Sequence, residues 1–341
     1  MSHSTEHNSR PEQSATLFIA ASETDSNLYY ATRFIAPDPF IYLEVKGERL
    51  MVMSDLEVDR ARNQATVDRV LSYSELERRA KSQGVKDPGT IDVIHLVLQD
   101  AGLKDILVPP TFPFLHASRL QEMGYRLRTK RDPFYEQRVM KSDDEVRHIE
   151  AAQRATETAV AAAHQHLRRA EIRDNVLWLD GEILTSERVK KLINVALMEC
   201  DCVAQHTIVA GGEQACDPHD EGSGPLPAHR SIIFDVFPRS AGTRYFADMS
   251  RTVVRGTPSP ELTRLYHAVK DAQEEAITKI RDGADGAAIH QGICDRFEKA
   301  GYKTGLVNGR MQGYFHGTGH GVGLDIHEAP RISRTGSLLQ E

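Results

Sequence analysis

The chain has 341 residues, with 42 basic and 49 acidic side chains and a net charge of −7. Its length predicts two domains. Its 40% hydrophobic and 27% charged residues exclude disordered, collagen-like and coiled-coil classes. Since no apolar run approaches the ~18 residues of a spanning helix, we expect no membrane segment. The acidic balance lacks the basic surplus that nucleic-acid binding requires.

The start of the chain and its cysteines bear on location. Residues 1–14 are polar, so we expect a disordered tail without the basic start and apolar run of a secretory signal. The four cysteines, Cys200, Cys202, Cys216 and Cys294, form no CxxC pair. Such sparse thiols fit a reducing compartment, and Cys200, Cys202 and Cys216 are interpreted as packing thiols without a chemical role. We therefore expect a cytoplasmic protein.

Residues 15–139 mix short apolar runs with helical segments, which predicts an α/β domain. Strands are expected at residues 17–20, 40–45, 49–53 and 105–110, and a helix at 91–102. No catalytic constellation is found in this half.

A second domain, residues 140–341, is predicted to begin with Ser142 and Glu145, which form an S-x-x-E capping box before a helical run to Ala170. Further helices are expected at residues 186–199, 260–281 and 287–300, and strands at 203–211, 231–237 and 244–254. The glycine-rich segment 313–327 is expected to be extended or irregular.

Two aspartates, Asp235 and Asp248, lie within apolar strand sequence, where an uncompensated carboxylate would cost several kcal/mol. A hairpin centred on Ala241-Gly242 would place them opposite each other, with Cβ atoms ~5 Å apart. Two carboxylates that close repel unless a cation lies between them, and they suit two metal ions ~3.5 to 4 Å apart. The pattern therefore suggests a dinuclear metal site.

The alternative for this pair is structural: one aspartate would bind Arg244 or Arg251 and the other would cap a turn. Three histidines in twelve residues, His316, His320 and His327, favour ligand or proton-transfer roles. In extended chain, His316 and His320 would share one face.

A fourth histidine, His219, lies in a loop between two predicted strands. Carboxylate and imidazole ligands without thiolate favour Mn, Co, Fe or Zn. A phosphate-binding loop is disfavoured, because neither GxGxxG nor GxxxxGK[ST] is present.

These motifs resemble the creatinase/prolidase/methionine aminopeptidase family, whose catalytic domain has the pita-bread fold. The second half carries, in order, Pro218-His219, FDVFP, FADMSRT and HGTGHGVGLDIHE. Residues 15–139 resemble the family's N-terminal creatinase-like domain through DPFIYL and MSDLEVDRAR. The fold class implied is α/β (α+β), an N-terminal α/β domain followed by a pita-bread domain.

The resemblance implies a role for each matched residue. Asp235 and Asp248 would bind a pair of divalent metal ions, with Mn²⁺ first and Co²⁺, Zn²⁺ or Fe²⁺ as alternatives, and His320 would bind one of them. His219, His316 and His327 would be catalytic, through hydrogen bonds to the substrate and proton transfer to the leaving amine. The implied reaction is metal-assisted hydrolysis by an activated water.

The closest function by resemblance is an X-Pro aminopeptidase, which cleaves before a proline in second position; an X-Pro dipeptidase is the alternative. Creatine hydrolysis is disfavoured, because creatinase lacks the metal aspartates. The N-terminal domain implies a homodimer or larger homo-oligomer.

One feature departs from the family pattern. The sequence given ends at Glu341, where a segment with two glutamate ligands is expected, and the pita-bread domain is therefore interpreted as incomplete. This keeps open a non-catalytic member that binds peptide or protein.

Overall fold

The computed structural model describes residues 14–340. The chain forms two compact units, one ending at Tyr135 and one beginning at Glu136. The predicted disordered tail, residues 1–14, lies outside the described residues except for Ser14, and so does Glu341. No helix between residues 14 and 340 is long and apolar enough to cross a membrane.

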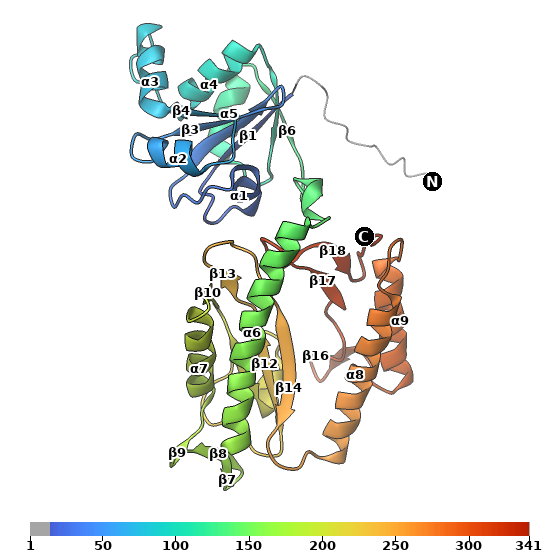
Figure 1. Ribbon diagram of the computed structural model, residues 1–341. Helices are drawn as coiled ribbons and strands as arrows, with labels where there is room; N and C mark the ends of the chain where they lie inside the picture. Colours follow the sequence, from blue (N-terminus) through green and yellow to red (C-terminus); the bar gives the residue numbers. More distant parts are fainter. Residues whose placement is uncertain (1–13, 341) are drawn as a thin grey trace, which may run out of the picture. The chain divides into compact units, whose positions relative to one another are not determined.

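The first unit is built on one six-stranded mixed sheet (Figure 1). Its strands are β1 (Ser14–Ala20), β2 (Phe40–Val45), β3 (Glu48–Met53), β4 (Arg69–Ser72), β5 (Asp105–Val108) and β6 (Arg126–Thr129), in the order β4-β3-β2-β1-β5-β6. Its helices are α1 (Ser26–Thr32), α2 (Val58–Gln64), α3 (Tyr73–Ser82), α4 (Thr90–Ala101) and α5 (Phe114–Glu122). Strands β1, β2 and β3 pair antiparallel, whereas β4, β5 and β6 join in parallel.

Strand β1 is buried on both faces, which explains its continuous apolar run. On one face, the ring of Phe18 lies 4.8 Å from that of Phe134 and 6.0 Å from that of Tyr42. On the other, Leu17 belongs to the cluster that contains Ile94 of α4. The core of this unit is therefore two apolar layers on either side of the sheet.

The second unit begins with η1 (Glu136–Arg138) and the long helix α6 (Asp143–Arg169). The predicted capping box is confirmed: Ser142 Oγ accepts from the N–H of Glu145, and Glu145 Oε2 accepts from the N–H of Ser142. Helices α6 and α7 (Ser186–Met198) cover the antiparallel sheet β11-β12-β14 (Figure 1). The strands of this half are β7 (Glu171–Arg173), β8 (Val176–Leu179), β9 (Glu182–Ile183), β10 (Cys202–Val203), β11 (Ile208–Gly211), β12 (Ser231–Val236), β13 (Arg239–Ser240) and β14 (Met249–Val254), with η2 (Gly212–Cys216) after β11.

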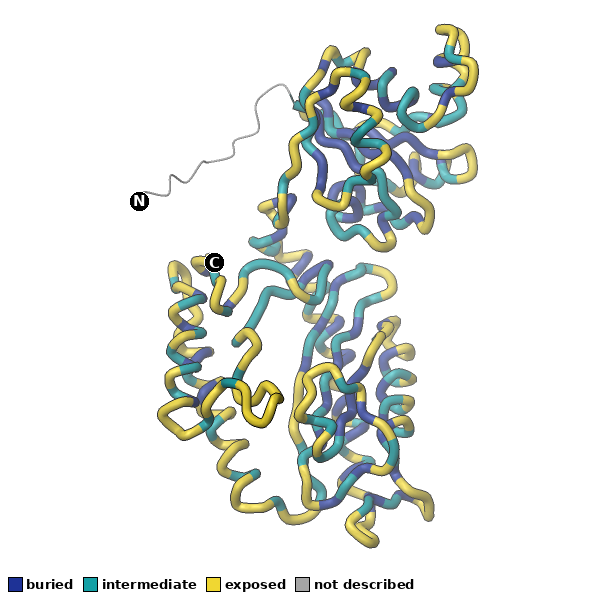
Figure 2. Tube along the Cα trace, turned by 180° about the vertical axis from the view of Figure 1, so that it is seen from behind, coloured by how far each residue is buried: buried dark blue, intermediate teal, exposed yellow. Residues whose placement is uncertain are grey.

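The last part of the chain forms a smaller cluster around α8 (Pro260–Lys279) and α9 (Gly286–Lys299). Its strands are β15 (Gly305–Val307), β16 (Arg310–Gln312), β17 (Gly319–Gly321) and β18 (Glu328–Ile332). Ala272 and Ala276 of α8 pack with Ile289 and Ile293 of α9. Figure 2 shows that this part is mostly exposed or half-buried, whereas buried residues are more frequent in the part of the second unit before it.

Some predicted elements were wrong in extent. The strand expected at 203–211 is two strands, β10 and β11, which pair with different partners. The strand expected at 244–254 begins only at Met249. Within segment 313–327, strand geometry is confined to β17, because glycines do not favour one extended conformation. Of the cysteines interpreted as packing thiols, Cys202 is buried, but Cys200 and Cys216 are exposed.

Candidate functional site

Asp235 and Asp248 lie on the hairpin formed by β12 and β14, but not directly opposite each other. Asp235 pairs with Ser250, two residues beyond the predicted partner. The predicted tight turn at Ala241-Gly242 is wrong because Ser240 pairs with Cys202 of β10, and Ala241 donates its N–H to the carbonyl of Asp201. The turn is therefore longer by two residues.

A shift of two residues keeps both aspartates on the same face, because side chains alternate with a period of two. This face is the less buried one: Asp235 and Asp248 are half-buried, whereas Phe234, Val236 and Ala247 point into the apolar core. The shared face that the sequence predicted is thus retained, at diagonal rather than direct spacing.

The side chain of Asp248 lies next to that of His320, which comes from a distant part of the sequence. Asp248 Oδ2 lies 3.4 Å from His320 Nε2, and both side chains are about one-quarter exposed, at 29% and 26%. His320 Nδ1 lies 3.1 Å from the carbonyl oxygen of Gly321. Since a carbonyl oxygen only accepts, Nδ1 donates its proton to Gly321, and Nε2 is the nitrogen that faces the carboxylate.

Burial, and after it the nearby charge of Asp235, raise the pKa of Asp248 to about 6, and His320 opposes both. Two carboxylates that face a common region repel each other unless a proton or a cation lies between them, and a neutral imidazole can join them as a ligand of such a cation. The donor set of Asp235, Asp248 and His320 therefore fits a divalent cation chemically.

The ligand atoms of these three side chains do not converge on one ion position. Asp235 Oδ1 accepts from Ser250 Oγ at 2.6 Å. Among residues 14–340, no three His, Cys, Asp or Glu side chains are grouped closely enough to hold one ion.

His327 lies beside His320, with ring centroids 4.4 Å apart and planes nearly perpendicular. Burial lowers the pKa of His327, and the charges of His320 and of His219 lower it too. His219 itself is exposed, in a turn where Asp217 Oδ1 accepts its N–H at 3.0 Å. The structure thus places His327 beside His320, where the charges of Asp235 and His219 act on it.

His316 contacts a different set of side chains. Its ring packs edge-on against Tyr314, 4.7 Å away, and its Nδ1 lies 2.8 Å from the carbonyl oxygen of Gly317. It also contributes to a lowered pKa of His290 on α9, for which burial is the main cause. Because β17 begins at Gly319, the extended geometry assumed for residues 316–320 fails there, and the predicted common face with His320 is not formed.

Glycines around His320 allow close backbone approach. A Cβ on Gly321 would lie 2.4 Å from the carbonyl oxygen of Ala329, and one on Gly323 would lie 2.3 Å from Glu328 Oε1. Both distances are shorter than any stable contact, so these glycines are required by space. The glycine-rich pattern therefore has a packing explanation as well as a functional one.

Sequence reasoning missed the polar side chains that support the site. Ser250 binds Asp235 and belongs to the FADMSRT motif, so its position two residues after Asp248 was a usable signal. Arg138 and Lys141 bind Glu328 from a segment almost 190 residues earlier. No local pattern predicts such a long-range ion pair.

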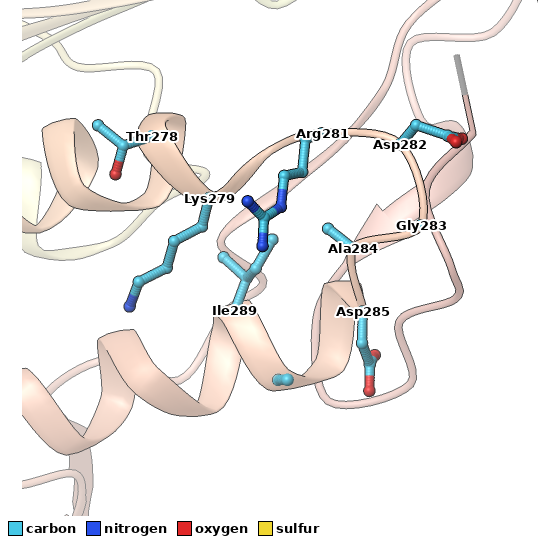
Figure 3. Close-up of a pocket in the computed structure, with 9 residues that line it drawn as sticks. Thr278, Lys279, Arg281, Asp282, Gly283, Ala284, Asp285 and Ile289 are labelled. Carbon is cyan, nitrogen blue, oxygen red and sulfur yellow. The ribbon is translucent and has the colours of Figure 1, made fainter.

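A pocket of about 470 Å³ lies at the turn between α8 and α9 (Figure 3). Its charged side chains already have local roles: Lys279 Nζ binds Glu275 at 2.6 Å, and Asp285 caps α9 by accepting from the N–H of Ala287. Figure 3 shows Asp282 directed away from the space between the helices. This pocket offers no convergent catalytic groups.

The comparison with known proteins decides the family, since residues 147–341 match metallopeptidase family M24. The chain belongs to family M24. An uncharacterized peptidase of Staphylococcus epidermidis is 31% identical over 167 residues, which are 48% of this chain and 44% of that protein. A Xaa-Pro dipeptidase of Pyrococcus horikoshii is 25% identical over 236 residues, 68% of this chain and 61% of that protein. The chain thus aligns with about half of the length of these M24 relatives.

The solved structures extend the likeness to the whole fold. The X-Pro aminopeptidase from Thermotoga maritima superimposes with a TM-score of 0.75 at 23% identity, covering 96% of this chain and 85% of that one. The predicted fold class, an N-terminal α/β domain followed by a pita-bread domain, is confirmed. Membership of M24 makes this protein a metallopeptidase relative and implies divalent metal ions.

Proposed function

We propose that the protein is a proline-specific exopeptidase that hydrolyses the peptide bond before a proline in second position, as an X-Pro aminopeptidase. One observation carries this proposal: within the region that matches M24, Asp248 and Nε2 of His320 face each other, with Asp235 on the same face as Asp248 and His327 beside His320. These are the residue types that metal-assisted hydrolysis requires.

Asp235, Asp248 and His320 would hold two divalent cations, with Mn²⁺ first among the candidates. When bound, such cations lower the pKa of a coordinated water and polarise a peptide carbonyl. The hydrogen bond from Nδ1 to Gly321 fixes the tautomer of His320 that leaves Nε2 available. Ser250 orients the carboxylate of Asp235.

His327, His219 and His316 would act on the substrate. The lowered pKa of His327 keeps its imidazole neutral near pH 7, so the ring has one N–H donor and one acceptor nitrogen. A neutral imidazole can donate to a developing oxyanion or pass a proton to the leaving amine. His219 and His316 are exposed in turns and are proposed to contact the peptide.

The remaining parts of the proposal follow from the family. Residues 15–139 would be the creatinase-like domain and residues 140–341 the catalytic domain, in a homodimer or larger homo-oligomer in the cytoplasm. An X-Pro dipeptidase is the nearest alternative, because the Pyrococcus horikoshii relative carries that name.

A different class of function is a non-catalytic member that binds peptide in the same place. It is favoured by one observation, that no three ligand side chains among residues 14–340 are grouped around one ion position.

The test adds Mn²⁺ to the purified protein and follows release of the first residue from X-Pro-Y peptides and from X-Pro dipeptides. Turnover of the longer peptide that a chelator abolishes supports the aminopeptidase, and turnover of the dipeptide alone supports the dipeptidase. Binding without turnover supports the non-catalytic member. Asp248→Asn is expected to keep the fold but to lose Mn²⁺ binding, and an active Asp248→Asn variant would refute the ligand role.

A further inference from the structure

An ion cluster holds the loop that carries His327. Arg138 Nη2 lies 2.7 Å from Asp325 Oδ2 and 2.7 Å from Glu328 Oε2, and Lys141 Nζ lies 2.6 Å from Glu328 Oε1. The side chains of Arg138, Glu328 and Lys141 are 7%, 10% and 15% exposed. Arg138 and Glu328 are thus withdrawn from water at one point, whereas the side chain of Asp325 is 49% exposed.

A cluster of this kind is weak evidence for stability, because desolvation offsets most of the attraction, and apolar side chains of similar volume would often stabilise as well. It does fix geometry, because a buried carboxylate that leaves its partners is strongly penalised. The planar guanidinium of Arg138 adds direction, since its N–H groups point along fixed lines.

The cluster binds the loop between β17 and β18 on both sides of His327, at Asp325 and at Glu328. The N–H of Asp325 also lies 3.3 Å from Glu328 Oε2, which closes the loop on itself. Gly323 leaves the space that the Glu328 carboxylate fills, because a Cβ there would lie 2.3 Å from Oε1. Glu328 therefore has little room for another rotamer.

Glu328 is the first residue of β18, and its side chain points to Arg138, whereas the ring of His327 lies against that of His320. His327 itself lies in the loop, one residue before β18 begins. Because the cluster fixes Asp325 and Glu328 on either side of His327, it restricts the backbone of His327, and the imidazole is held against the ring of His320.

We infer that Arg138 is a positioning residue for His327, acting through Glu328. The role in turnover rests on the proposed function, whereas the placement of the His327 ring does not. A cluster that only stabilises the fold would change the melting temperature and leave the ring and the turnover number unchanged.

The test compares wild type with Glu328→Gln, Arg138→Met and Arg138→Lys. Glu328→Gln keeps the shape of the side chain and is the variant that best preserves the fold. The matched control is Arg79→Met, which breaks a two-point ion pair with Asp100 on the surface of the first unit.

Two measurements are made on each full-length variant. Imidazole resonances are recorded by NMR without metal, with His327→Gln to assign His327. The kcat and KM for an X-Pro-Y peptide are measured with Mn²⁺.

Glu328→Gln and Arg138→Met should move the His327 resonances and lower kcat about 10- to 100-fold, with KM changed less than about threefold, since misplacement of a catalytic group acts on the transition state. Arg138→Lys should recover part of the loss, and Arg79→Met should match wild type. Unchanged His327 resonances in folded Glu328→Gln and Arg138→Met overturn the inference, as does an unchanged kcat in an active enzyme. Shifted resonances in a protein that hydrolyses no X-Pro peptide refute the proposed function and leave the placement of His327 by Arg138 supported.

Discussion

The two units of this chain handle charge in opposite ways. The first unit keeps its ion pairs on the surface, such as Arg79–Asp100, whose side chains are 42% and 51% exposed. In the described chain, the two charged residues that are buried, Arg138 and Glu145, both belong to the second unit. The difference indicates that the first unit is stabilised by its apolar layers, whereas the second uses buried charge to hold particular side chains in place.

The largest effect is expected at the centre of the sheet of the first unit, where the apolar layers should provide most of the stability. Phe18→Ala removes a ring that contacts Phe134 and Tyr42, and it should cost about 3–5 kcal/mol through lost burial and a cavity. Hydrogen exchange of peptides from β1 and β2 measures the loss locally. Phe114→Ala is the matched control, because Phe114 is 84% exposed; equal losses in both variants would contradict the apolar layers as the source of stability.

The pair of aspartates predicts a pH-dependent cost in the second unit. The folded-state pKa of Asp248, about 6, is above its ordinary value of 3.8, so the native state binds more protons between these values. Stability of the metal-free protein should therefore fall as the pH rises from about 4 to about 6. Asp248→Asn removes this loss, and its advantage over wild type should grow to at most about 3 kcal/mol near pH 7.

Urea unfolding in the presence of a chelator measures this advantage, with Trp178, the sole tryptophan of the chain, as a reporter within the second unit. A difference between Asp248→Asn and wild type that does not change with pH would contradict the raised pKa of Asp248, which burial and then the charge of Asp235 cause.

A smaller effect is expected at the start of α6. The hydroxyl of Tyr245 donates to Glu145 Oε1 at 2.6 Å, and both residues are buried. Tyr245→Phe should cost about 2 kcal/mol, because a hydrogen bond to a buried carboxylate is lost. Trp178 fluorescence during urea unfolding measures it, with Tyr266→Phe on the exposed side of α8 as control. A neutral Tyr245→Phe would show that the second unit does not depend on this contact.

The smallest effect is expected at the surface ion pair of Arg79 and Asp100 in the first unit. Arg79→Met breaks a surface ion pair with two hydrogen bonds, and it should cost less than about 1 kcal/mol, because exposed pairs are screened by water and salt. Far-UV circular dichroism during urea unfolding measures the change. A loss of 2 kcal/mol or more would mean that the first unit also depends on charge.

The sequence predicted what is encoded locally. The capping box at Ser142 and the common face of Asp235 and Asp248 follow from spacing alone, and the structure has both. The exact register of the hairpin could not be predicted, because Ser240 pairs with a strand forty residues earlier. The contacts of His316 were hidden for a similar reason, since they depend on how Tyr314 packs beside α9.

The fold around the site was therefore predictable from patterns and from a family resemblance, but its supporting contacts were not. Arg138 and Glu328 are 190 residues apart in sequence and carry no shared periodicity. Ion pairs of this kind are set by tertiary packing, which a single sequence does not reveal.

The capped start of α6 has one further consequence. Two contacts start within eight residues of each other. Arg138 binds Glu328, the residue after His327, and Glu145 accepts a hydrogen bond from Tyr245, three residues before Asp248. Both halves of the site are thus attached to one short segment, residues 138–145, which runs from the end of η1 into the first turn of α6. A single alanine inserted after Lys141, in the non-helical stretch between η1 and α6, would lengthen this segment and shift one anchor relative to the other. The spacing between Arg138 and Glu145 therefore sets how the loop of His327 lies relative to Tyr245 and Asp248.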